Sequence, residues 1–298
     1  MKTETVEGFR FPLQSPLFYV NNRERYQRQE WIKQIEAVTG RRLIAYISNF
    51  SHPESGINRN DVLPFIEILS DLPEGGDVDL LIHTPGGDPN ATEQMVNSLL
   101  PKVANLRVIV PLSAKSAGTM MALVADEIVM SDSSELGPID PQVVIRNATG
   151  GASSRPAKAF LKGLQNIQDE VNRNNGQLNP AYFPILQSVD AAQIQFCHQA
   201  EAHAEKIAKK WLLRSMCSGD SQKAQKIAEE LLDIEKYPNH GNVISWKDAT
   251  DIGLNVCYLP PSDDLWKAFW TLIALYDNDM KINKTIKIFE GSKLSVTI

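Results

Sequence analysis

The stretch that decides the fold is VIVPLSAKSAGTMMALVADEIVM, residues 108–130. A hydrophobic run ends at Pro111, a turn of small residues presents Ser116, and an apolar helix is expected from Ala117. A serine at a strand-to-helix corner exposes its hydroxyl, and the amide of the next residue points at charge that develops beside it. An ordinary helix N-cap is the alternative role. The segment therefore predicts either a nucleophile or a cap at Ser116.

A glycine turn lies upstream of this corner. The segment HTPGGDPNATEQMVNSL, residues 83–99, ends a hydrophobic strand at His83 and enters a helix after Pro-Gly-Gly. Two glycines at a strand end let backbone N–H groups approach a ligand that a side chain would block. Such a turn is one way to build an oxyanion hole, and a simple strand-to-helix turn is the alternative.

Short apolar runs alternate with longer helical patterns around both motifs. Strands are predicted at 43–47, 78–83, 106–111 and 127–130, and helices at 61–72 and 91–103. This alternation indicates an α/β fold of βαβ units with right-handed crossovers and a buried, mostly parallel sheet. The turn-forming segment SHPESGIN, residues 51–58, predicts a mobile loop beside a site.

Three regions are expected along the chain. Residues 1–40 read as an N-terminal arm with a docking helix at 24–38, residues 41–175 as the α/β core, and residues 176–298 as a helical appendage and C-terminal segment. A helix is predicted at 156–172, at the end of the core, and strong helical patterns follow beyond the core at 191–213 and 222–232.

Composition excludes several classes of protein. The chain has 298 residues, 43% hydrophobic and 22% charged, with a formal charge of -6, which does not suit a dedicated nucleic-acid binder. Its three cysteines form no CxxC pair, which argues against a disulfide framework or a zinc cluster. The first residues, MKTETVEGFRFPLQ, lack the apolar core of a secretory signal, so a cytoplasmic location is expected. No metal spacing, P-loop or GxGxxG occurs, and no cofactor is expected.

Three motifs in order carry a resemblance. HTPGG, then SAKSAGTMMALVADEIVM, then ELGPIDPQ resemble the serine dehydrogenase proteinase family of the Clp-protease/crotonase superfamily, which is related to signal peptide peptidase A and to NfeD-type peptidases. The match covers roughly residues 40–175, and a weaker one continues at HGNVISWKDATDIGLNV, residues 240–256. The resemblance implies a ClpP/crotonase-like βαβ superhelical core and a serine peptidase acting on peptides or proteins.

The resemblance also implies roles for the corner and the turn. Ser116 would be the nucleophile, and the Ala117 amide would lie in the oxyanion hole. Gly86 or Gly87 would supply the second donor. These roles agree with what the turn chemistry suggests independently.

The general base is less clearly marked. Clp-type peptidases use a histidine soon after the serine, where this chain reads PIDPQ, whereas the signal peptide peptidase and NfeD-type relatives use a lysine farther downstream. Lys158 and Lys162 follow Ser116 by 42 and 46 residues and share one helix face. Lys158, in the apolar run RPAKAFL, suits the burial that a neutral lysine needs, although a solvated lysine is the commoner case. Lys162 and His240 are the alternatives.

We therefore expect a serine peptidase with a Ser116/Lys158 dyad. Related peptidases form rings, so a homo-oligomer is expected, and membrane proteins are among the candidate substrates. Two alternatives have the same fold. One is a crotonase-like enzyme in which the oxyanion hole stabilises the enolate of an acyl thioester. The other is a non-catalytic scaffold that kept the fold and lost the base.

Overall fold

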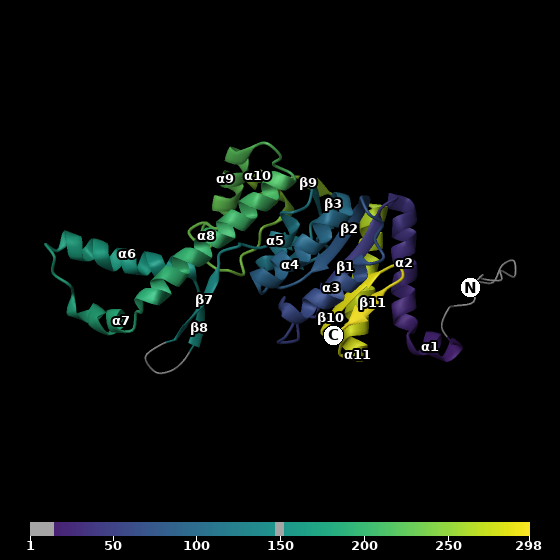
Figure 1. Cartoon of the computed structure of the whole chain (residues 1–298), viewed down its shortest axis with the longest axis horizontal. Helices are drawn as coiled ribbons and strands as arrows, with labels where there is room; N and C mark the ends of the chain where they lie inside the picture. Colours follow the sequence, from purple (N-terminus) through teal and green to yellow (C-terminus); the bar gives the residue numbers. More distant parts are fainter. Residues whose placement is uncertain (1–14, 147–151) are drawn as a thin grey trace.

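The computed structural model describes residues 15–146 and 152–298, and its centre is a seven-stranded sheet of order β11-β10-β1-β2-β3-β5-β9 (Figure 1). The strands are β1 (Arg42–Ser48), β2 (Gly76–His83), β3 (Val103–Ile109), β5 (Glu127–Met130), β9 (Val256–Tyr258), β10 (Lys287–Gly291) and β11 (Ser295–Thr297). The five strands from β1 to β9 pair in parallel, and β10 and β11 are antiparallel additions beyond β1. The predicted parallel α/β core is confirmed.

The central strands are apolar on both faces because both faces are covered. In β1, Ile44 and Tyr46 face one layer of helices, whereas Leu43, Ala45 and Ile47 face the other. All five side chains are at most 2% exposed. Continuous hydrophobic runs of this kind are typical of parallel strands buried between two helical layers.

Two helical layers cover the sheet. One layer consists of α3 (Val62–Leu69), α4 (Pro89–Leu99), α5 (Ala117–Ala122), α9 (Ser221–Leu231), α10 (Trp246–Ile252) and the second half of α8 (Ala191–Arg214). The other consists of α2 (Arg23–Thr39) and α11 (Asp264–Asn283), which pack together through Ile32, Ile35 and Phe269. The expected docking helix at 24–38 is therefore α2, and it docks within its own chain.

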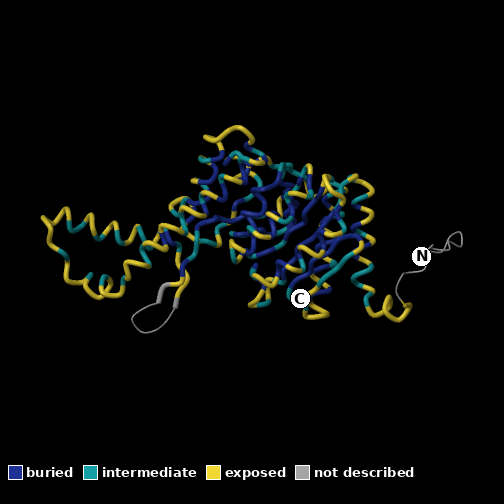
Figure 2. Tube along the Cα trace, in the orientation of Figure 1, coloured by how far each residue is buried: buried dark blue, intermediate teal, exposed yellow. Residues whose placement is uncertain are grey.

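A helical arm projects from this body (Figure 1). A two-stranded ribbon, β7 (Gln142–Arg146) with β8 (Ala152–Pro156), leads into α6 (Ala157–Arg173), η3 (Pro180–Tyr182), α7 (Phe183–Gln187) and the first half of α8. We call residues 157–200 the arm. It is largely exposed (Figure 2), since α6 buries only Ala157 and α7 buries no residue. The helices predicted at 156–172, 191–213 and 222–232 are confirmed to within about one residue.

The sheet does not end at the boundary expected near residue 176. Strands β9, β10 and β11 come from the last third of the chain and complete the same sheet. The segment TIKIFEGSK, residues 285–293, was not predicted as a strand because charged residues interrupt its apolar ones. Residues 1–14 of the expected N-terminal arm lie outside the described residues. Among the described helices, none is both long and apolar enough to cross a membrane.

Candidate active site

Ser116 lies at the corner between β4 (Ser113–Ala114) and α5. Its backbone has φ 51° and ψ −115°, which is unfavourable for a residue with a Cβ. Ser116 occupies the N-cap position, yet its side chain makes no capping hydrogen bond. It lines a cavity of about 930 Å³. The corner therefore holds an uncommitted hydroxyl in a strained conformation, as active sites often do.

The glycine turn touches this corner directly. A Cβ on Gly86, whose φ is 88°, would lie 2.4 Å from the Lys115 carbonyl oxygen and 2.8 Å from the Ser116 Cβ. A Cβ on Gly87, whose φ is 149°, would lie 2.3 Å from the Ile57 carbonyl oxygen. Real Cβ atoms do not approach so closely, so both positions require glycine. The backbone of the glycine turn therefore lies directly against the serine corner.

The hydrogen bonds of the turn distinguish its two glycines. The Ile57 amide donates to the Gly86 oxygen at 2.7 Å and the Asp88 amide donates to the Ile57 oxygen at 2.8 Å, one on each side of Gly87. The Gly86 amide donates to the Thr84 hydroxyl at 3.2 Å. Within the described residues, the Gly87 amide has no protein acceptor.

The second amide at the cavity belongs to Ala117. As the first residue of α5 it has no acceptor within its helix, and Ala117 lines the same cavity as Gly87 and Ser116. The α5 N-terminus also carries the positive end of the helix dipole. The arrangement can stabilise negative charge that develops next to the serine hydroxyl.

A histidine and a buried carboxylate line the same cavity. His240 Nδ1 lies 2.7 Å from Asp140 Oδ1. The Asp140 side chain is 2% exposed and that of His240 is 29% exposed. Asp140 Oδ2 accepts a second hydrogen bond from Gln142 at 2.7 Å. A carboxylate that accepts the Nδ1 proton of an imidazole leaves Nε2 as the basic nitrogen.

The turn that carries His240 is tied to the serine corner. Leu136 and Ile244 exchange two backbone hydrogen bonds of 2.9 and 3.1 Å. The Lys115 ammonium donates to the Leu136 oxygen at 3.1 Å and to the Asn242 oxygen at 3.2 Å. Because Lys115 precedes the serine, one side chain links the corner, the loop before Asp140 and the turn after His240.

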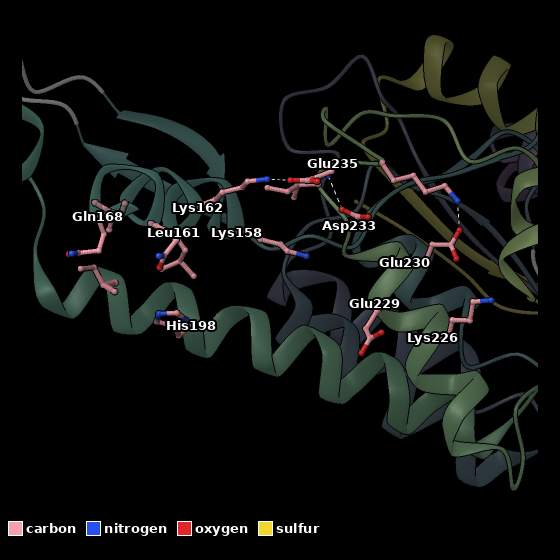
Figure 3. Close-up of a pocket in the computed structure, with 15 residues that line it drawn as sticks. Lys158, Leu161, Lys162, Gln168, His198, Lys226, Glu229, Glu230, Asp233 and Glu235 are labelled. Atoms are coloured by element: carbon pink, nitrogen blue, oxygen red, sulfur yellow. Dashed lines mark hydrogen bonds and ion pairs between the residues drawn. The ribbon is translucent and has the colours of Figure 1, made fainter. Parts of the chain in front are cut away.

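Lys158 and Lys162 do not line this cavity. Both line a separate cleft of about 1140 Å³ among α6, α8 and α9, where Glu229, Glu230 and Asp233 are neighbours (Figure 3). The closest hydrogen bond of the Lys158 ammonium is a 3.5 Å contact with the Leu232 carbonyl oxygen. Lys162 pairs with Glu235, and its side chain is 51% exposed. In this conformation the α6 residues that sequence spacing singled out face α9.

The remaining cavity wall is mostly uncharged. As expected for a loop beside a site, Pro53, Ser55 and Gly56 of the segment 51–58 line it. One face of α8 supplies residues spaced by three and four positions, which are Phe196, Gln199, Ala200, His203 and Ala204. The arm helix therefore forms one side of the cavity. No cluster of three or more His, Cys, Asp or Glu side chains suited to a metal ion occurs among the residues described.

Asp140 is the site residue that sequence reasoning undervalued. From the sequence, this residue of the Pro-bounded loop GPIDPQ reads as structural. Its position between two prolines at the end of a matching motif was the available signal. Its hydrogen-bond partner, His240, is 100 residues away in the sequence, and this pairing could not be predicted from spacing alone.

Comparison with known proteins places the chain in a family. A model of the ClpP-like SDH-type serine proteinases matches residues 18–171. Two uncharacterized proteins of Methanocaldococcus jannaschii are similar: MJ1495 is 36% identical over 134 residues, which is 39% of this chain and 42% of the relative, and MJ0137 is 48% identical over 109 residues, which is 37% and 35%. The chain matches less than half of the length of either relative.

Two solved structures align with low similarity. A serine-to-alanine mutant of the 1510-N membrane-bound stomatin-specific protease aligns over 72% of this chain and 79% of that chain, with a TM-score of 0.42 and 17% identity. A lysine-to-alanine mutant of that protease with a substrate peptide aligns over 72% and 91%, with a TM-score of 0.29 and 14% identity. The family model, in contrast, matches more than half of the chain, and the protein therefore belongs to the ClpP-like SDH-type serine proteinases, a family of hydrolases.

Proposed function

We propose that this chain is a serine peptidase in which Ser116 is the nucleophile, His240 the general base and Asp140 the residue that orients the base. The observation that carries the proposal is the shared cavity: a strained, uncapped serine and a histidine–carboxylate pair line the same space. Family membership supplies the reaction class.

The chemistry follows from this arrangement. The Ser116 Oγ attacks the peptide carbonyl carbon while His240 Nε2 takes its proton. The carbonyl oxygen becomes an oxyanion and accepts hydrogen bonds from the Gly87 and Ala117 amides, each worth about 3 kcal/mol in a site that excludes water. Collapse breaks the C–N bond, and the proton on Nε2 passes to the leaving amine. Water, deprotonated by the same imidazole, then hydrolyses the acyl-enzyme.

The Ser116/Lys158 dyad is the second candidate for the base. For this dyad to form, α6 would have to turn toward Ser116. The Lys158 side chain would then leave a cleft lined with acidic residues and enter the mostly uncharged cavity of Ser116. Lys158 lines a cleft that Ser116 does not line, whereas His240 lines the serine's own cavity. Geometry therefore favours His240, and the same objection applies to Lys162.

The side chains of the cavity wall indicate which peptide side chains the cavity accommodates. Asp140 is the acidic residue of the wall and is already paired, and most of the surrounding side chains are apolar or uncharged. An unpaired charge of a substrate would find no partner among them, so we propose that peptides with apolar or uncharged side chains at the scissile bond are preferred. Assembly of several copies and membrane-protein substrates are proposals that follow from the family resemblance, and a cytoplasmic location is proposed as well.

A fluorophosphonate probe tests the nucleophile. We expect covalent labelling of the wild type and no labelling of Ser116→Ala, because the probe reacts with an activated serine hydroxyl. Ser113→Ala is the matched control, since the Ser113 hydroxyl is bound to Glu135 at 2.5 Å, and it should label like the wild type. Labelling that survives Ser116→Ala would refute the nucleophile. Turnover of an acyl thioester that Ser116→Ala fully retains would instead favour the crotonase-like alternative.

A further inference from the structure

A buried ion pair lies directly behind the glycine turn. The Lys287 ammonium on β10 donates to both Asp61 carboxylate oxygens at 2.7 and 2.8 Å. The two residues are 1% and 0% exposed. Asp61 also accepts hydrogen bonds from the Tyr46 hydroxyl and the Asn58 amide, each at 2.9 Å. None of these groups takes part in the proposed peptidase chemistry.

The third hydrogen bond of the ammonium leads to the cavity. Lys287 Nζ donates to the Gly56 carbonyl oxygen at 2.7 Å, and Gly56 lines the cavity of Ser116. The next residue, Ile57, makes the two backbone hydrogen bonds that flank Gly87. The segment 56–57 is therefore held by Lys287 on one side and holds the glycine turn on the other.

Burying a lysine in this way is costly. Two charges removed from water are compensated only when all their hydrogen-bonding capacity is met, and well-packed apolar residues of similar volume are often at least as stabilising. All three N–H donors of Lys287 have acceptors, and one of them is backbone at the cavity wall. An apolar pair could fill the same volume but could not hold the Gly56 carbonyl group.

We propose that Lys287 is a positioning residue for the oxyanion hole, acting on the Gly87 amide through Gly56 and Ile57. The proposal rests on the proposed peptidase function. It predicts that loss of Lys287 weakens stabilisation of the transition state more than binding of the substrate, because only the transition state places a full charge on the oxyanion.

The experiment compares hydrolysis of a p-nitrophenyl acyl ester with that of its thionoester, in which sulfur replaces the carbonyl oxygen. Sulfur accepts hydrogen bonds poorly, so the ratio of the two kcat/KM values reports the oxyanion hole. For Lys287→Met we expect kcat on the ester to fall about tenfold or more, KM to change by less than about twofold, and the ester-to-thionoester ratio to fall by about threefold or more.

Two further variants separate positioning from stability. Arg28→Met is the matched control, because Arg28 binds Glu290 on the opposite face of the same strand β10 and is also 1% exposed. It should lower the unfolding midpoint and leave the ratio unchanged. Asp61→Asn with Lys287→Met removes both buried charges, and it is the test variant if Lys287→Met alone fails to fold.

The outcomes are distinct. A Lys287 variant that folds and keeps the wild-type kcat and ratio overturns the positioning role while the peptidase proposal stands. A double variant with full activity does the same. If the wild type shows no ester hydrolysis that depends on Ser116, the peptidase proposal fails and the positioning role fails with it.

Discussion

The body and the arm of this molecule bury their side chains very differently. The strands of the body contain side chains with almost no exposed surface, whereas α6 and α7 of the arm together bury one residue, Ala157 (Figure 2). The groups that require precise geometry, Ser116, Gly87 and His240, lie on the body. The arm supplies one face of α8 to the cavity wall. The comparison teaches that the well-packed body holds the groups proposed for catalysis, whereas a largely exposed element supplies part of the cavity wall.

The largest effect should come from replacing His240 on the body, and replacing Lys158 on the arm is the comparison. His240→Ala should lower kcat/KM for an activated ester by about 10³-fold, because the proposed general base is lost and Asp140 has no imidazole left to orient. Lys158→Met on the arm should change it by less than about threefold. Steady-state kinetics at pH 7.5 measure both. The reverse result would place the base on the arm and break the comparison.

The same residue type in the two regions should contribute differently to stability. Phe65 in α3 is fully buried, so Phe65→Ala should lower the free energy of unfolding by about 3–5 kcal/mol. Phe183 in α7 is 51% exposed, and Phe183→Ala should cost less than about 0.5 kcal/mol. Urea unfolding followed by circular dichroism tests both. A large loss for Phe183→Ala that grows with protein concentration would indicate that another copy covers the arm.

Acid should destabilise the body through His83. This partly buried imidazole stacks on Phe50 with ring centroids 4.2 Å apart, and burial lowers its pKa to about 4. An unfolded chain has a histidine pKa of about 6.5 and binds the proton earlier, so stability is full above pH 6.5 and falls by about 3 kcal/mol as the pH drops to 4. Urea midpoints across this range should show the loss, and His83→Gln should flatten that part of the slope. An unchanged slope would contradict the prediction.

The smallest effect concerns the contact between the arm and the body. Lys162 on α6 pairs with Glu235, and both side chains are more than half exposed. Lys162→Ala should therefore change the unfolding free energy by less than about 0.5 kcal/mol and leave ester hydrolysis unchanged. Thermal unfolding at low and high salt is the measurement. A larger loss would mean that this pair anchors the arm.

The chain's local patterns were enough to predict the parallel core, the serine corner and the glycine turn. Each depends on residues close in sequence, such as the apolar run before Pro111 or the two glycines that follow Pro85. The direction in which α6 leaves the body could not be predicted, because helical periodicity says which residues share a face and not what that face meets. Lys158 was therefore predicted from the family resemblance, its spacing from Ser116 and the apolar run RPAKAFL, none of which shows what its helix faces.

The features that were not predicted depend on contacts between segments that are distant in the sequence. The pairing of His240 with Asp140 depends on a turn that Lys115 and Ile244 hold against the serine corner, and none of these residues marks another in the sequence. Strand β10 likewise reads as polar because Lys287 and Glu290 alternate with apolar residues. Lys287 can be buried because it pairs with Asp61, and Glu290 because it pairs with Arg28.

The order of these parts along the chain bears on how the protein is made. Ser116 and the glycine turn leave the ribosome well before His240, with the whole arm in between, and β10 follows later still. A nascent or truncated chain that holds the corner but lacks the later turn does not contain the proton acceptor that we propose for Ser116. Under the proposed mechanism, the capacity to cut therefore arises only after the turn that carries His240 has been made.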